Sequence, residues 1–191
     1  MEQRELIKLS ISEHINVLNS LNEDDIKSLE KIASLISKKL INGNKIIWCG
    51  NGGSASDCQH LSAEFVGRYK KNRKALSSIS LTTDTSALTC ISNDFSYEYI
   101  FSRQLEALGN RGDVLVAIST SGNSKNILSV LKTAKELDIA SVGLLGKKGG
   151  ESKDLCDLSF IVPSCTTARI QEIHILIGHI ICEIIELDYE K

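Results

Sequence analysis

The chain has 191 residues, 42% of them hydrophobic, which is enough to bury one substantial core, and we expect a single domain. Its net charge of -2 argues against a dedicated nucleic-acid binder, because phosphate backbones call for a basic surface and the one local basic run is 68–74. No apolar stretch reaches the roughly 18 residues of a membrane span, and the charged N-terminus lacks the apolar core of a signal peptide. The six cysteines contain no CxxC pair, which fits buried thiols in a reducing compartment. We therefore expect a cytoplasmic protein that binds neither nucleic acid nor membrane.

Two helical patterns open the chain. Apolar residues recur at helical spacing from Leu6 to Leu18 and from Ile26 to Ile36, with Asn22 before the second pattern and Gly43 after it. We expect these helices, residues 1–43, to be part of the same domain as the core, residues 44–191.

Strands and helices then alternate. The pattern predicts strands at 45–49, near 79, and at 114–118, 141–145 and 158–162, with helices from about 54, at 85–91, 97–108 and 125–137, near 153, and at 167–187. Such alternation predicts an α/β fold with a doubly wound, mainly parallel sheet flanked by helices. The last helix is apolar nearly all round, so together with the two N-terminal helices it predicts an oligomer interface.

Two loops at predicted strand ends are suited to ligand binding. The first, CGNGGS at 49–54, offers three glycines and Asn51 where backbone amides can face a ligand, and Ser54 can cap the next helix. The second, STSGNS at 119–124, offers the hydroxyls of Ser119, Thr120, Ser121 and Ser124 and ends at a helix N-terminus, which favours an anion. A serine-rich turn that caps a helix would account for one or two of these hydroxyls. We expect the second loop to hold a phosphate and the two loops to frame one phosphorylated, polyhydroxylated molecule.

Titratable residues lie on two of the predicted helices. His60 and Glu64 are four residues apart and share a helix face, as a catalytic pair or as a solvent-facing hydrogen-bonded pair. Gln171 and His179 share a broad face of the last helix, whereas His174 points away and is expected to be structural. His60, Glu64, His179 and the Gln171 amide form a borderline metal set, with zinc favoured over magnesium because of the imidazoles. Since Gln171 and His179 lie roughly 12 Å apart along a helix, joint ligation needs convergent side chains or different subunits.

Seven segments resemble the phosphoheptose isomerase (sedoheptulose 7-phosphate isomerase) branch of the sugar isomerase (SIS) family, and the resemblance covers essentially the whole chain. They are CGNGGS (49–54), QHLSAEF (59–65), TTDTS (82–86), NDF (93–95), FSRQ (101–104), STSGNS (119–124) and RIQEIH (169–174). The resemblance implies a single SIS domain that converts sedoheptulose 7-phosphate to D-glycero-D-manno-heptose 7-phosphate, an early step of ADP- or GDP-heptose synthesis for surface glycans such as the lipopolysaccharide core. It also implies a homotetramer with one zinc ion per subunit held by His60, Glu64, Gln171 and His179. Some members carry an acidic residue where this chain has Ala168, so we assign that position no role.

The chemistry of a ketose–aldose isomerase suggests roles for these residues. Proton transfer between C1 and C2 through an enediol needs a base and an acid, which we assign to Glu64 and His179. A carboxylate bound to zinc is a poorer base, and the sequence does not decide how Glu64 could serve both as a zinc ligand and as the base. We expect the substrate to contact the glycine loop, the predicted sugar-binding residues and the hydroxyl loop: Asn51, Gly52, Gly53, Ser54, Glu64, Asn93, Asp94, Ser119, Thr120, Ser121, Ser124 and Gln171.

Two other functions are compatible with a SIS fold. One is a tetrameric regulator that binds the bacterial replication initiator without isomerase activity, and the presence of both Glu64 and His179 argues against it. The other is a phosphosugar sensor that controls transcription, which would need a DNA-binding module for which the chain has neither room nor charge.

Overall fold

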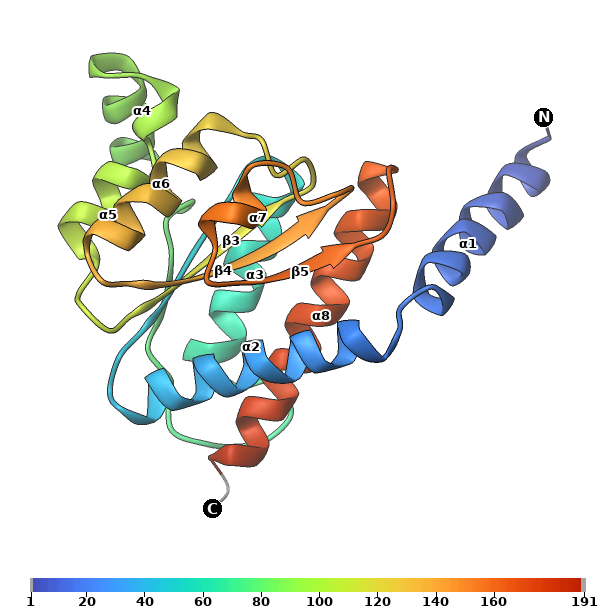
Figure 1. Ribbon diagram of the computed structural model, residues 1–191, viewed down its shortest axis with the longest axis horizontal. Helices are drawn as coiled ribbons and strands as arrows, with labels where there is room; N and C mark the ends of the chain where they lie inside the picture. The colour runs from blue at the N-terminus through green and yellow to red at the C-terminus, as the bar shows by residue number, and fades with distance from the viewer. Residues whose placement is uncertain (1, 190–191) are drawn as a thin grey trace.

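The computed structural model of the protein describes residues 2–189 and contains a five-stranded parallel sheet between two layers of helices (Figure 1). The sheet order is β2-β1-β3-β4-β5. The strands are β1 Ile46–Gly50, β2 Ser78–Ser80, β3 Val114–Ser119, β4 Ala140–Gly146 and β5 Leu158–Val162. The predicted α/β class with a doubly wound parallel sheet is confirmed.

The helices follow the predicted order with one difference. They are α1 Gln3–Asn19, α2 Glu23–Ile41, α3 Gly53–Val66, α4 Thr85–Asp94, α5 Ser102–Leu108, α6 Lys125–Glu136, α7 Ser152–Leu155 and α8 Thr167–Asp188. The prediction of one helix over 97–108 is wrong: a 3₁₀ turn, η1 Tyr97–Tyr99, precedes α5. The Ser96 hydroxyl accepts the Glu98 N–H at 3.2 Å and starts the 3₁₀ turn, and Ile100 and Phe101 between the two helices are buried.

Each face of the sheet has its own core. Alternate residues of β3 face opposite sides, so Val116 packs with the buried faces of α2, α3 and α8, whereas Leu115 packs with α5 and α6. Trp48 of β1 lies fully buried in the first core, where its ring is 5.9 Å from that of Phe65 in α3. Because α3 and α8 cover the same face, residues more than 100 positions apart can meet across them.

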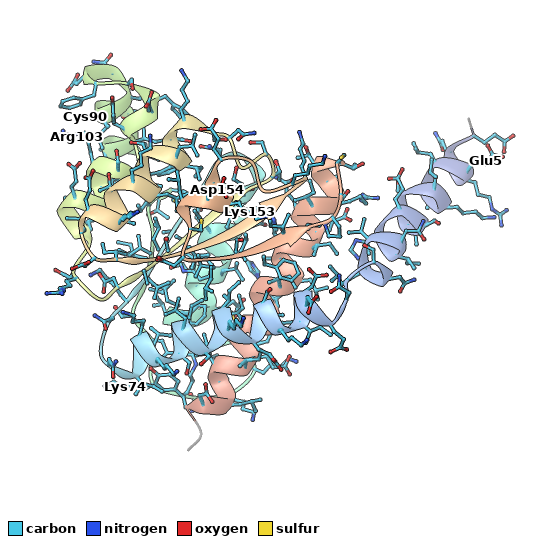
Figure 2. The ribbon with its side chains drawn as sticks, viewed as in Figure 1. Glu5, Lys74, Cys90, Arg103, Lys153 and Asp154 are labelled. Carbon is cyan, nitrogen blue, oxygen red and sulfur yellow. The ribbon has the colours of Figure 1, made fainter. Side chains whose placement is uncertain are left out.

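The N-terminal helices differ in how they contact the sheet. Asn22 begins α2 with a capping box, in which its side chain accepts the Asp24 and Asp25 N–H groups and the Asp25 carboxylate accepts the Asn22 N–H. The apolar face of α2 is buried, whereas α1 buries no residue and extends away from the body, with Glu5 near its outer end (Figures 1 and 2).

Within residues 2–189, no helix combines the length and hydropathy needed to cross a bilayer. The six cysteines are free thiols, of which Cys49, Cys58 and Cys182 are buried.

Candidate active site

The two predicted ligand loops lie side by side. The chain leaves β1 toward β2 on one side and returns as β3 on the other, so the sheet has its topological switch point between β1 and β3. Gly50, the last residue of β1, is paired with Ile118 in β3. The glycine loop and the hydroxyl loop therefore leave the same edge of the sheet from neighbouring strands.

The glycine loop turns directly into α3. Gly52 adopts a positive φ of 57° as the N-cap residue, and the helix begins at Gly53. The expectation that Ser54 caps this helix is wrong, because the left-handed Gly52 lets the helix begin earlier and places Ser54 inside its first turn. The Ser54 side chain is buried, and its backbone N–H donates to the Asn51 carbonyl at 3.1 Å.

Asn51 is held in one orientation by two residues that the sequence did not reveal. Its Nδ2 donates to Asn126 Oδ1 at 2.9 Å, while its Oδ1 accepts from Asn126 Nδ2 at 2.8 Å and from the Tyr97 hydroxyl at 2.8 Å. Both acceptor directions of Oδ1 are occupied, so one N–H of Asn51 remains to donate to a ligand. A cavity of about 440 Å³ opens beside this network and is also lined by Ser124 and Lys125.

The hydroxyl loop is supported by backbone contacts with Gly149 and Ser152. A Cβ on Gly122, whose φ is 66°, would overlap the carbonyl of Gly149, and the Gly122 carbonyl accepts the Ser152 N–H at 2.9 Å. Ser119 Oγ accepts the Gly122 N–H at 3.1 Å, and Ser121 Oγ accepts the Asn123 N–H at 3.2 Å. An accepting hydroxyl still has its own proton to donate.

Ser124 stands at the N-cap of α6, where its side chain forms no capping hydrogen bond. With Thr120, which is only partly buried, it completes the set of four predicted hydroxyls at this helix N-terminus. The loop thus has the donors and the backbone support that a phosphate site requires.

His60, Glu64 and His179 meet where α3 packs against α8. A Cβ at Gly178 would overlap the Leu61 side chain, so the glycine allows the two helices to approach closely. His60 Nε2 lies 2.9 Å from His179 Nε2 and 3.4 Å from Glu64 Oε1, and the candidate donor atoms of all three residues lie within 4.8 Å of one another. The three side chains therefore share one location.

The environment of this cluster favours a neutral His179. Partial burial lowers its pKa, the neighbouring His60 lowers it further, and Glu64 acts in the opposite direction. The cluster is open on one side, because the His60 side chain is 51% exposed. A ligand can therefore reach the imidazole nitrogens and the carboxylate together.

Gln171 lies at the other end of the same helix pair. A Cβ on Gly53 would come within 2.6 Å of Gln171 Nε2, so this amide packs on the glycine loop. His60 follows Gly53 by seven residues, about 10 Å along α3, and Gln171 is separated from His179 by a similar distance along α8. One chain thus brings three of the four predicted metal ligands together and leaves Gln171 beside the loop.

Asn93 and Asp94 lie apart from these groups. They form the exposed end of α4, where Asn93 Nδ2 donates to Asp94 Oδ1 at 2.8 Å. Asp94 also accepts from Cys90 Sγ at 3.4 Å, and Figure 2 shows Cys90 beside Arg103 at the outer edge of the molecule. A cavity of about 260 Å³ between α4 and the glycine loop is lined by other residues of that helix, among them Leu88 and Ser92.

His174 occupies the buried side of α8, as expected for a structural residue. It is fully buried, and its Nε2 lies 3.0 Å from the carbonyl oxygen of Leu145, to which the neutral ring donates. Burial lowers its pKa to about 4, although the hydrogen bond to Leu145 opposes this shift. His174 therefore belongs to the core and not to the histidine cluster.

Two further residues beside the cluster were not predicted. The Tyr69 ring stacks on His179, with centroids 5.3 Å apart and planes at 20°. Asp57, one turn before His60 on α3, has a buried Oδ2 without a hydrogen-bond partner among residues 2–189. Burial raises the pKa of Asp57, while His60 counteracts the shift. The helical spacing of Asp57, His60 and Glu64 could have indicated that Asp57 lies beside the cluster, whereas the position of Tyr69 depends on a loop.

The comparisons with known proteins identify the class to which this fold and site belong. A family model described as the SIS domain matches residues 11–146. Phosphoheptose isomerase 1 of Campylobacter jejuni is 58% identical over 158 residues, which cover 83% of this chain and 85% of that protein. Phosphoheptose isomerase of Clostridium acetobutylicum is 49% identical over 185 residues, or 96% of this chain and 94% of that protein.

The solved structures agree. Phosphoheptose isomerase GmhA from Neisseria gonorrhoeae superposes with a TM-score of 0.92 at 41% identity, covering 97% of this chain and 99% of that one. The chain therefore belongs to the phosphoheptose isomerase family of SIS-domain proteins, and it is an isomerase.

Proposed function

We propose that this isomerase converts sedoheptulose 7-phosphate to D-glycero-D-manno-heptose 7-phosphate through an enediol. The observation that carries the proposal is the pairing of the hydroxyl loop after β3 with the cluster of His60, Glu64 and His179 between α3 and α8. A seven-carbon sugar phosphate carries its anion and its carbonyl at opposite ends, so it needs two separate groups of residues. The product would enter ADP- or GDP-heptose synthesis for surface glycans.

Glu64 and His179 supply the proton transfers. Glu64 removes a proton from C1 of the ketose while His179 donates a proton to O2, which gives the enediol. Glu64 then returns its proton to C2, and His179 takes the proton from O1, so both residues end in their starting states. The lowered pKa favours a neutral His179, which would pass through an imidazolate after giving its ring proton to O2 and become neutral again on taking the proton from O1.

The same three side chains fit a zinc ion. Two imidazole nitrogens and a carboxylate oxygen are a borderline donor set, and they already lie within 4.8 Å of one another. We propose that His60, Glu64 and His179 hold zinc, with Gln171 as a fourth ligand. Zinc would polarise the carbonyl oxygen and stabilise negative charge on the enediol oxygens. Purified protein should then contain up to one zinc per subunit, and a chelator should lower activity without unfolding the domain. Full activity in protein shown to be metal-free would refute this role.

The other predicted residues position the substrate. The side-chain amide of Asn51 and the backbone amides of Gly52 and Gly53 lie at the glycine loop, where a sugar chain between the two ends would pass. Ser119, Thr120, Ser121 and Ser124 would hold the phosphate, whose remote binding energy orients the reacting carbons.

We further propose a homotetramer in which subunits complete each other's sites. The exposed residues of α1 include five aliphatic side chains, Leu6, Ile7, Leu9, Ile11 and Ile15, each 47 to 60% exposed. Such a surface on a helix that extends from the body favours burial against another subunit. Gln171, Asn93 and Asp94 lie away from the cluster of their own chain, so another chain would supply them.

The decisive test of the reaction is incubation of purified protein with sedoheptulose 7-phosphate and detection of the aldose by NMR. Turnover in D₂O should also replace one carbon-bound proton with deuterium. The reason is that the proton that Glu64 takes from C1 can exchange with the solvent before Glu64 returns a proton to C2. A protein without any new aldose signal would refute the proposal. The relatives found do not favour the alternative regulator of replication initiation.

Shared sites can be tested by mixing inactive subunits. If Gln171 serves the cluster of a neighbouring chain, Glu64→Gln and Gln171→Ala subunits should regain partial activity when unfolded together and reassembled. Glu64→Gln mixed with His179→Gln is the matched control, and it should stay inactive because these two residues meet within one chain. Absence of recovery in heterotetramers verified by mass spectrometry would place Gln171 in the site of its own chain.

A further inference from the structure

A buried carboxylate holds the loop that follows α3. Glu186, in the last turns of α8, is 3% exposed and accepts three successive backbone N–H groups. They are those of Tyr69 at 2.9 Å, Lys70 at 3.0 Å and Lys71 at 3.1 Å. The loop runs on to Lys74, which Figure 2 shows on the side of the molecule where α8 ends. The backbone at 69–71 is thus fixed to the helix that carries His179.

Arg73 connects the same carboxylate to the end of α3. Its Nε lies 3.3 Å from Glu186 Oε1, and its side chain is only 8% exposed. Its Nη2 donates to the Glu64 carbonyl at 2.7 Å and its Nη1 to the Phe65 carbonyl at 2.9 Å. These carbonyls lie in the last turn of a helix and have no intrahelical partner. Arg73 thus caps the helix at the residue that we assign as the base.

The loop places an aromatic ring against the acid. Tyr69 stacks on one side of the His179 imidazole at 5.3 Å, and the His60 ring meets it edge-on at 5.1 Å. The Tyr69 backbone N–H is one of the three that Glu186 accepts. The orientation of His179 therefore depends on a loop whose conformation depends on Glu186.

We propose that Glu186 and Arg73 are positioning residues that act as a clamp, fixing the Glu64 backbone through Arg73 and the His179 ring through Tyr69. The proposal rests on the proposed function in so far as Glu64 and His179 are the base and the acid. A buried ion pair often contributes less stability than apolar residues of the same size, so its presence here is better explained by the geometry that it enforces. Although burial alone would raise the pKa of Glu186, the three N–H donors and Arg73 lower it, which keeps the carboxylate charged.

Four variants separate positioning from general stability. Glu186→Gln keeps the size but loses the negative charge and replaces one of the two acceptor oxygens with an NH2 donor, so it cannot accept all three N–H groups, and Tyr69→Ala loses the ring. Each should lower kcat about 10- to 100-fold, the range seen when residues that orient active groups are removed, with KM changed less than about threefold. Tyr69→Phe should restore wild-type kcat because the ring remains. Glu183→Gln is the matched control: it removes an exposed carboxylate one turn earlier on α8, which pairs with the Lys70 side chain at 2.8 Å, and it should leave kcat unchanged.

A second readout does not depend on activity or metal. In chelator-treated protein, the ring of Tyr69 should shift the imidazole C–H resonances of His179, assigned by their loss in His179→Gln. Glu186→Gln and Tyr69→Ala should both abolish this shift, and Tyr69→Phe and Glu183→Gln should retain it. Arg73→Lys, which cannot bridge Glu186 and two carbonyls, takes the place of Glu186→Gln if that variant does not fold, and it too should abolish the shift.

The outcomes distinguish this proposal from the reaction itself. A folded Glu186→Gln, or Arg73→Lys in its place, that keeps the wild-type shift would overturn the clamp, and so would Tyr69→Ala with wild-type kcat. A wild-type protein that shows the shift but forms no aldose would refute the proposed function while the NMR comparison still decides the clamp.

Discussion

The hydroxyl loop and the histidine cluster are built in opposite ways. The loop is six consecutive residues that run from the last residue of β3 to the N-cap of α6, and its four hydroxyls come together as soon as that strand and helix form. The cluster joins His60 and Glu64 of α3 to His179 of α8, and it exists only because both helices pack on the same face of the sheet. The loop is supported by backbone contacts from 149 and 152, whereas the cluster is supported by side chains and by the loop at 69–73.

This difference separates binding from chemistry. A phosphate has the same shape and charge in many sugars, so a rigid local structure suffices to hold it. Proton transfer requires a base and an acid whose spacing is set to within a fraction of an ångström, and here that spacing depends on tertiary contacts. Changes in the cluster should therefore affect turnover, and changes in the loop should affect binding.

Loss of the base should have the largest effect. Glu64→Gln keeps the size of the side chain but removes the proton acceptor, and we expect kcat to fall roughly 100-fold or more with KM little changed. Steady-state kinetics with NMR detection of the aldose measures both constants. Turnover close to wild type in Glu64→Gln would move the base to another residue, and Asp57, on the same face of α3, would be the first to examine.

His179→Gln should reduce turnover to a similar extent and would also remove a metal ligand if zinc is bound. Zinc content, measured in the same preparation, separates the two causes. A variant with full zinc and low kcat would support the acid role, and one without zinc would show that the metal accounts for at least part of the loss.

Removing two hydroxyls of the phosphate loop should have a smaller effect, confined to binding. Ser119→Ala combined with Ser124→Ala should weaken the binding of phosphorylated sugar about 10- to 100-fold, because each hydroxyl donates to a dianion. The affinity for a nonphosphorylated analogue should hardly change, and calorimetry with both ligands measures the contrast. Equal weakening of the two ligands would show that these serines support the fold instead.

The sequence predicted the local parts of this molecule well. The strand at 158–162 has the predicted bounds, and Asn22 begins α2 as expected, because alternation and capping are properties of a few neighbouring residues. The wrong prediction that Ser54 caps α3 has the same origin. A serine is the usual cap, and the pattern could not show that Gly52 adopts a left-handed conformation and begins the helix two residues sooner than a cap at Ser54 would.

The assembled parts were only partly predictable. Helical spacing placed His60 beside Glu64, but it could not show that Gln171 packs on Gly53, since that contact depends on the relative positions of two helices. Tyr69 and Arg73 lie in the basic run 68–74, where charged side chains are ordinarily exposed, yet Arg73 is buried against Glu186. A charged residue in a basic run gives no local signal of the partner that buries it.

Protonation of His174 should change the stability of the fold and leave the reaction unaffected, since this residue lies on α8 between Gln171 and His179 but faces the core. Its pKa of about 4 in the folded state lies below the 6.5 of an unfolded histidine. Between these values only the unfolded chain binds the proton, so falling pH stabilises the unfolded state. The free energy of unfolding should therefore decrease from about pH 6.5 down to about pH 4, by about 3 kcal/mol from this residue.

Urea unfolding at a series of pH values measures this loss, and His174→Gln is the informative variant because its side-chain amide can still donate to the Leu145 carbonyl. Other groups titrate in the same range, so the quantity to compare is the difference between the two curves. The difference should narrow as the pH falls, since only the wild type loses the contribution of a neutral buried imidazole. Parallel curves would mean that His174 is protonated in the folded protein as readily as in the unfolded chain. At neutral pH the two proteins should have the same kcat, because His174 contacts Leu145 and lies outside the histidine cluster.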